Sequence, residues 1–126
     1  MQRSIIPFKK LKNSWRMPIY NLNGQRYETA ANRAYYCAYT SVKALLQEKE
    51  IYAKTHTGVQ NKFNQLFVLP RIFDSIHSSR LSQLYQLRQI VDYDLSTSID
   101  EEATVEAVKY ARELLIEVKK WAEENL

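Results

Sequence analysis

Hydrophobic residues recur along much of this chain at intervals of three and four, the spacing of an α-helix with one buried face. The first long stretch predicts a helix over residues 25–50, with an inward stripe formed by Ala30, Ala34, Ala38, Val42 and Leu45 or Leu46. The last predicts a helix from residue 101 nearly to residue 126, with a stripe formed by Ala103, Ala107, Ala111, Leu114, Val118 and Ala122. Ser98 and Glu101 have the spacing of a capping box at the start of this last helix.

Two shorter helices are expected between these long ones. Thr57 and Gln60 have the spacing of a capping pair at the start of the second helix, and Pro70 should end or kink that helix. The third should begin at residue 78 or 79 and end near residue 93 or 95. Long, short, short and long helices in this order are typical of a bundle with antiparallel neighbours. The sequence therefore predicts an all-α fold, an antiparallel up-and-down four-helix bundle.

The amino-terminal residues follow neither the helical nor the strand period, and Pro7 and Pro18 interrupt any long element there. We expect an irregular basic arm over residues 1–22, with at most one short helix, and a bundle domain over residues 23–126. The arm carries too many apolar side chains for a solvated tail, so part of it should dock on the body or on another subunit. Its cations should either grip a nucleic-acid backbone or only keep the arm solvated. They are Arg3, Lys9, Lys10, Lys12 and Arg16.

Composition indicates a folded domain that is stabilised by burial alone. The 126 residues include only 2 Gly and 3 Pro against 45% hydrophobic residues, which argues against disorder and against a turn-rich β fold. The single cysteine, Cys37, cannot form an internal disulfide and has no partner at zinc-ligand spacing, so no metal or other cofactor is predicted. The net charge of +4 favours an acidic partner. Without a membrane-spanning run or a signal peptide, we expect a cytoplasmic protein and no membrane partner.

Four motifs occur in order along the chain. They are residues 31–39 (ANRAYYCAY), residues 54–59 (KTHTGV), residues 87–93 (LRQIVDY) and the alanine-striped helix from Glu101. In this combination, over about residues 22–122, the chain resembles the HEPN family, particularly its small stand-alone prokaryotic members. The resemblance implies a helical bundle that forms a homodimer through the helices carrying these motifs.

The resemblance also implies chemistry on RNA. Many HEPN proteins are metal-independent endoribonucleases, or toxins paired with a minimal nucleotidyltransferase antitoxin. In active members an arginine and a histidine on one helix face meet their symmetry copies in a dimer cleft. The arginine would hold the scissile phosphate with a charge-assisted fork, and the histidine would transfer a proton near neutral pH.

This sequence departs from the active pattern at one position. The residue five places after Arg88, where the histidine would stand, is Tyr93, and Asp92 precedes it. A phenol with a pKa of about 10 is a poor general base at pH 7, so Asp92, Tyr93 or a residue from elsewhere would have to transfer the proton. The predicted catalytic residues are therefore Arg88, Asp92 and Tyr93. Arg33, Tyr36 and Arg88 are the residues predicted to bind nucleic acid or a nucleotide.

Each of these residues also has a plain structural interpretation. Arg88 and Asp92 are spaced as an ordinary surface ion pair on one helix, and Tyr93 could simply pack at the helix end or be modified by a partner nucleotidyltransferase. Tyrosines spaced like Tyr36 and its neighbours are usually core and interface filler. His56 is expected to orient the start of the second helix, with catalysis as the other role. His77 lies about 16 Å from Arg88 along a helix axis, so only a second subunit could bring the two close.

Two functions of different classes remain open from the sequence. The first is an RNA-directed HEPN-type protein, either an endoribonuclease or the toxin component of a toxin–antitoxin system. The second is a non-catalytic module that binds a nucleotide or a protein and acts with a partner nucleotidyltransferase. The retained Arg88 favours the first, and the missing histidine favours the second.

Overall fold

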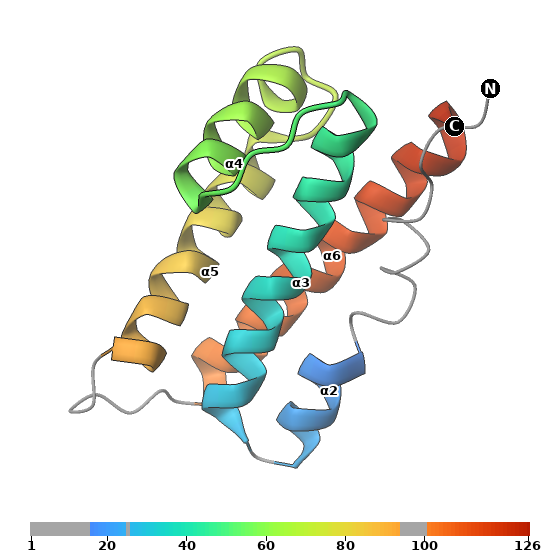
Figure 1. Cartoon of the computed structure of the whole chain (residues 1–126). Coiled ribbons are helices and arrows are strands. Elements are labelled where there is room, and N and C mark those ends of the chain that lie inside the picture. The colour runs from blue at the N-terminus through green and yellow to red at the C-terminus, as the bar shows by residue number, and fades with distance from the viewer. Residues whose placement is uncertain (1–15, 25, 94–100) are drawn as a thin grey trace.

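The computed structural model describes residues 16–24, 26–93 and 101–126, and every regular element within them is a helix (Figure 1). The all-α class predicted from the sequence is confirmed. The elements are α2 (Arg16–Asn23), α3 (Tyr27–Glu48), α4 (His56–Phe63), a short π-helical continuation η1 (Asn64–Val68), α5 (Ser75–Tyr93) and α6 (Glu101–Asn125).

The two long helices lie where the apolar stripes predicted them. In α3 the stripe residues Ala30, Ala34, Ala38, Val42 and Leu45 are all fully covered. The stripe of α6 is buried from residue 107 to residue 118, and α3 packs along α6 over much of its length. Small side chains on both faces allow this close approach. The predicted cap Ser98 lies outside the described residues.

The start of α4 differs from the prediction. Its N-cap is Thr55, whose side-chain oxygen accepts a hydrogen bond from the Gly58 backbone N–H at 3.0 Å. Thr57 lies inside the first turn and is exposed, because Thr55 has the extended backbone that an N-cap requires and Thr57 does not. Gln60 does not complete a capping box. Its amide donates to the Ser78 carbonyl at 2.9 Å and so ties α4 to α5.

The third predicted helix begins earlier than expected, at Ser75. Asp74 precedes it, and its carboxylate accepts a hydrogen bond from the Ile76 backbone N–H at 2.9 Å. This aspartate caps the helix four residues ahead of Ser78, the first of the two serines that the sequence suggested. The helix before it continues as η1 to Val68, and the chain turns through Pro70 and through Arg71, whose φ is 63°.

An extended connection between α3 and α4 sets the direction of the helices. Glu50 has a left-handed backbone with a φ of 61°, and the chain then runs back along α3 before α4 begins (Figure 1). As a result α3 and α4 run in the same direction, with Tyr35 beside the start of α4 and Lys49 beside the ring of Phe67. The predicted antiparallel order holds for α4 with α5 and for α5 with α6, but not for α3 with α4.

Aromatic rings from α4, η1, the turn before α5 and α6 pack together at one end of the bundle. Phe67 packs edge-on against Phe73 and Trp121, with ring centroids 5.6 and 5.5 Å apart, and Phe63 lies 5.7 Å from Phe73. Phe63 and Phe67 are completely covered. Edge-to-face pairs of this kind stabilise a core beyond the burial of their area.

The short helix α2 packs against α3 and touches α6 (Figure 1). Pro18 and Asn21 are buried in this contact, and Arg26 donates to the Asn21 side chain at 2.8 Å. The part of the predicted arm that the structure describes is therefore docked on the body. No described helix is long and apolar enough to cross a membrane.

Candidate functional site

Arg88 lies on α5 among aromatic rings that belong to α3. Its guanidinium carbon is 5.2 Å from the ring centroid of Tyr36 and 5.6 Å from that of Tyr35. Its Nε is 3.0 Å from a carboxylate oxygen of Asp92, one turn further along α5, but lacks the alignment of a hydrogen bond. The Arg88 side chain is only 20% exposed. The predicted ion pair is therefore present, and two aromatic contacts hold the cation in addition.

His56, the first residue of α4, joins this cluster. Its Nδ1 is 2.9 Å from the Tyr35 hydroxyl, and its ring stacks on Tyr85 with centroids 3.8 Å apart and planes 9° apart. Tyr85 lies three residues before Arg88 and therefore on the same side of α5. The name Arg88 site is used below for Tyr35, Tyr36, His56, Tyr85, Arg88 and Asp92.

Burial and the guanidinium set the charge states in the Arg88 site. The pKa of His56 is lowered from 6.5, first by burial and then by the positive charge of Arg88. The pKa of Tyr35 is raised, chiefly because burial disfavours the phenolate. Near neutral pH the imidazole is therefore neutral and the phenol keeps its proton.

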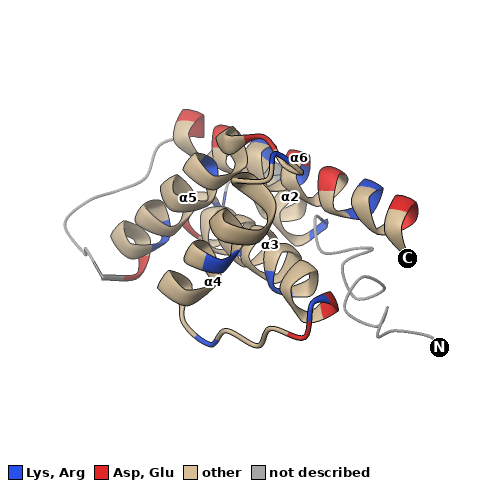
Figure 2. Cartoon of the chain, turned by 90° about the horizontal axis from the view of Figure 1, so that it is seen from above, with Lys and Arg blue, Asp and Glu red and all other residues tan. Residues whose placement is uncertain are grey.

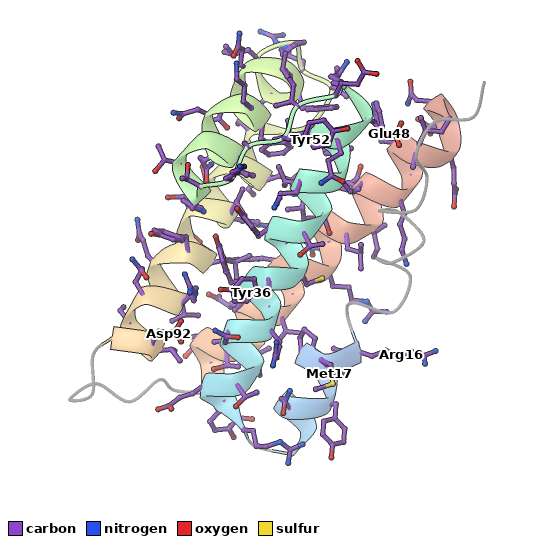
Figure 3. The ribbon with its side chains drawn as sticks, in the orientation of Figure 1. Arg16, Met17, Tyr36, Glu48, Tyr52 and Asp92 are labelled. Carbon is purple, nitrogen blue, oxygen red and sulfur yellow. The ribbon has the colours of Figure 1, made fainter. Side chains whose placement is uncertain are left out.

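Three of the sequence-predicted residues come together here. Tyr36 and Asp92 contact Arg88 from α3 and from α5, and Figure 3 shows both in the same half of the bundle on neighbouring helices. Asp92 also receives a 3.4 Å hydrogen bond from the Asn32 amide, which ties the start of α3 to the end of α5. The catalytic and binding roles assigned to these residues remain predictions.

Two predicted residues do not enter the cluster as described. Arg33 is exposed on α3, and no contact joins it to Arg88 among the residues that the structure describes. Tyr93 is the last residue of α5, and its side chain lies outside the described part. Tyr36, by contrast, is 38% exposed, so it can be reached from solvent, while Tyr35 is buried.

Sequence reasoning did not place His56 or Tyr85 in the site. The two lie in different helices, and the extended return of the chain after α3 is what brings His56 to the middle of α3. The only local signal was the position of His56 beside the predicted helix start. The structure places His56 directly after the capping Thr55, in the first turn of α4. Cys37, on the same helix as Tyr35, is buried.

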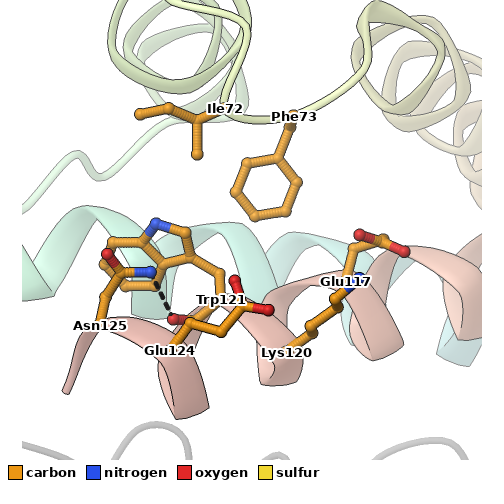
Figure 4. A pocket seen from close by; sticks show the side chains of 7 residues that line it. All are labelled: Ile72, Phe73, Glu117, Lys120, Trp121, Glu124 and Asn125. Carbon is orange, nitrogen blue, oxygen red and sulfur yellow. Dashed lines mark hydrogen bonds between the residues drawn. The ribbon is translucent and has the colours of Figure 1, made fainter.

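The other histidine is remote from this cluster. His77 is 7% exposed at the start of α5, against the ring of Phe73. Three pockets formed by described residues also lie away from the Arg88 site. One of about 320 Å³ is formed by the turn before α5 and the end of α6, where Phe73 and Trp121 face one another (Figure 4). None of the residues predicted for the site lines it.

The fold and this cluster define a class: a small all-α bundle whose polar site is built by an arginine and aromatic side chains from neighbouring helices. Within the described residues no group of histidine, cysteine, aspartate or glutamate is arranged to hold a metal ion. The HEPN domain family matches residues 18–121, and the chain belongs to this family.

Proteins of Methanocaldococcus jannaschii and Thermotoga maritima are similar to this chain. "Putative toxin MJ0605" of Methanocaldococcus jannaschii is 35% identical over 101 residues, which are 79% of this chain and 74% of that protein. "Putative toxin MJ0142" of the same organism is 36% identical over 80 residues, 64% of this chain and 54% of that protein. A "UPF0332 protein" of Thermotoga maritima is 27% identical over 103 residues, 82% of this chain and 78% of that protein.

Proposed function

We propose that the protein is an RNA-directed HEPN toxin that cleaves RNA without a metal ion at the Arg88 site. The observation that carries the proposal is the placement of the Arg88 guanidinium, beside two tyrosine rings and one turn from Asp92. Membership in the HEPN family and the names of the two Methanocaldococcus relatives support the toxin assignment.

The chemistry of Arg88 suits a phosphodiester. Asp92 lies against Nε, and the terminal nitrogens of a guanidinium carry further N–H donors that can bind two phosphate oxygens at once. The half-exposed ring of Tyr36 offers a face on which a base can stack. Charges of both signs alternate along α6, so we expect RNA to be held by this local site rather than by one broad basic face (Figure 2).

The proposal includes a homodimer in which two Arg88 sites face one another, and a nucleotidyltransferase antitoxin as partner. A second candidate function is a non-catalytic module that binds a nucleotide or a protein and acts through that partner. The tyrosine at position 93, where active members carry histidine, favours this second candidate.

The substitution Arg88→Ala tests the proposal. We expect the wild-type protein to cleave mixed RNA in the presence of a chelator, and the variant to lose cleavage by about 100-fold or more, as for the loss of a group that stabilises transition-state charge. Arg88→Lys should recover only part of the activity, because an ammonium lacks the planar fork. Cleavage is followed with end-labelled RNA, and light scattering of the same preparations reports the dimer.

Arg71→Ala is the matched control. Arg71 is an exposed arginine in the turn between η1 and α5, at the opposite end of α5 from Arg88. The Arg71→Ala substitution removes one positive charge, as Arg88→Ala does, and should leave cleavage unchanged. Equal cleavage by the Arg88→Ala and wild-type proteins would rule out the nuclease site, and RNA binding without cleavage in both would favour the non-catalytic module.

A further inference from the structure

The Arg88 site contains a histidine, although the usual position for one holds Tyr93. His56 and Arg88 come from different helices, and both contact Tyr35. The imidazole and the guanidinium carbon lie 5.8 and 5.6 Å from the centroid of that one ring. Both groups therefore flank the ring of Tyr35, and they are close enough for the charge of Arg88 to lower the pKa of His56.

We propose that His56 transfers the proton in the Arg88 site, that Tyr35 positions it, and that the substrate is a ribonucleotide phosphodiester. This inference rests on the proposed nuclease function and replaces the motif histidine by one from another helix. It also assigns the role that Asp92 or Tyr93 would otherwise have to fill.

The contacts of His56 leave one ring nitrogen for the substrate. Nδ1 faces the Tyr35 hydroxyl at 2.9 Å, so Nε2 is the atom that can meet a ribose. A hydroxyl can both donate and accept, so in one tautomer Nδ1–H donates a hydrogen bond to the Tyr35 oxygen and Nε2 keeps its lone pair for a proton. Stacking on Tyr85 fixes the plane of the ring. Histidines that act as bases are commonly held by a partner on the second nitrogen.

Burial and the charge of Arg88 favour the neutral form of His56, which is faced by groups from two helices. From α3 these are the hydroxyl of Tyr35 and the ring of Tyr39, and from α5 they are Tyr85 and the cation Arg88. A neutral imidazole at neutral pH is ready to accept a proton. Once protonated, it lies near another positive charge, which favours giving the proton up again.

His56 alone can carry the proton through the whole cleavage reaction. Nε2 of His56 removes the proton from the ribose 2′-hydroxyl while that oxygen attacks phosphorus. The bond from phosphorus to the 5′ oxygen breaks, and the imidazolium returns its proton to that departing oxygen. The products are a 2′,3′-cyclic phosphate and a 5′-hydroxyl, and the protein returns to its starting state. Arg88 binds the phosphate oxygens throughout.

The chain has only two histidines, so their ring signals can be followed separately by NMR. A 2′-O-methyl RNA oligonucleotide binds without being cleaved, since it lacks the attacking hydroxyl proton. We expect it to shift the signals and the pKa of His56 and to leave those of the buried His77 unchanged. His56 signals that stay fixed at saturating oligonucleotide would overturn the inference without any variant protein.

Activity measurements provide the second part of the test. His56→Asn keeps a polar atom for the Tyr35 hydroxyl but lacks Nε2, and should reduce cleavage by about 100-fold or more while RNA binding weakens far less. His77→Asn is the matched control and should cleave normally. Cleavage by the wild-type protein should rise with pH through the His56 pKa measured by NMR, and Tyr35→Phe should move that pKa and the pH profile together.

The outcomes separate this inference from the proposed function. If Arg88→Ala is inactive but His56→Asn cleaves like the wild type, the role of His56 is refuted and the nuclease function stands. If Arg88→Ala cleaves normally, the Arg88 site itself is refuted. A wild-type protein that binds RNA without cleaving it overturns the proton transfer, whatever the His56 signals show.

Discussion

Each of the two histidines is partly or fully buried and has its own neighbouring arginine. The pKa of His56 is lowered by burial and by Arg88, and the pKa of His77 is lowered by burial, with Arg80 acting in the same direction and Glu117 against it. These pairs are on separate parts of the molecule. Each arginine should therefore affect only its own histidine, which makes the two sites controls for one another.

We expect Arg88→Gln to raise the pKa of His56, because it removes a positive charge that disfavours the imidazolium. The pKa of His77 should not change. Arg80→Gln should raise the pKa of His77 and leave that of His56 unchanged. NMR titration of the two ring signals measures both. An Arg88→Gln protein with an unchanged His56 pKa would mean that the two side chains do not share one site in solution.

Much of the cluster's chemistry is local, and the sequence identified that part. Arg88 and Asp92 pair because they lie one turn apart on one helix, and this can be predicted from spacing alone. The exposure of Tyr36 and the burial of Tyr35 could not be assigned, because neighbouring positions on α3 face different surroundings only after α5 has packed. Nothing in the sequence indicated that Tyr85 belongs to the site, because its contact with His56 forms only when α4 and α5 pack together.

Helix starts depend on which of several polar residues caps them. Before α4 the two threonines Thr55 and Thr57 both have suitable side chains, and the sequence pattern favoured Thr57 because of Gln60. The backbone decides between them, since only Thr55 is extended and accepts the Gly58 N–H. Asp74 similarly caps α5 ahead of the serines. Long stripes predicted α3 and α6 well, because many residues contribute to each.

Thr55→Ala should destabilise the protein by about 0.5–2 kcal/mol, the usual cost of losing an N-cap hydroxyl. Thr57→Ala is the matched control and should change the free energy of unfolding little, because Thr57 is exposed and caps nothing. Urea denaturation followed by circular dichroism gives both values. Since His56 follows the cap directly, the Thr55→Ala protein should also show broader His56 ring signals. Equal destabilisation by the two substitutions would contradict the assigned cap.

The extended connection from Glu50 to His56 determines where α4 begins. From Tyr35 to Glu50 the helix and its end advance about 22 Å, at 1.5 Å per residue. Six extended residues return about 20 Å, at roughly 3.3 Å per residue. The return therefore nearly cancels the advance, and His56 comes to lie beside Tyr35. A shorter or helical connection would leave His56 far from the Arg88 site.

For the whole molecule, the lowered pKa values of the two histidines predict a loss of stability in mild acid. In both, the folded-state pKa is lower than the ordinary value of 6.5, so the unfolded chain binds protons first as pH falls. Their contribution to stability is complete above about pH 6.5 and decreases as pH falls below it. We expect a lower urea midpoint at pH 5.5 than at pH 7.5.

His77→Gln removes one of these two protonation sites and is the informative variant. Its midpoint should be lower than that of the wild type at pH 7.5, because a buried ring is lost, but its dependence on pH should be weaker. A pH dependence as steep as that of the wild type would show that His77 is not held neutral in the folded protein. Staying above pH 5 limits the contribution of carboxylates, whose ordinary pKa values are about 4.

Helical periodicity along the chain was sufficient to predict an all-α bundle, the two long helices and the Arg88–Asp92 pair, because each depends on residues within one or a few turns of one another. The direction of α4 and the meeting of Tyr35, His56 and Arg88 were not predictable in this way. They depend on how an extended loop and packed helices bring together positions 21 or more residues apart. Local spacing carries no information on such contacts, because they are set by the shape of the whole core.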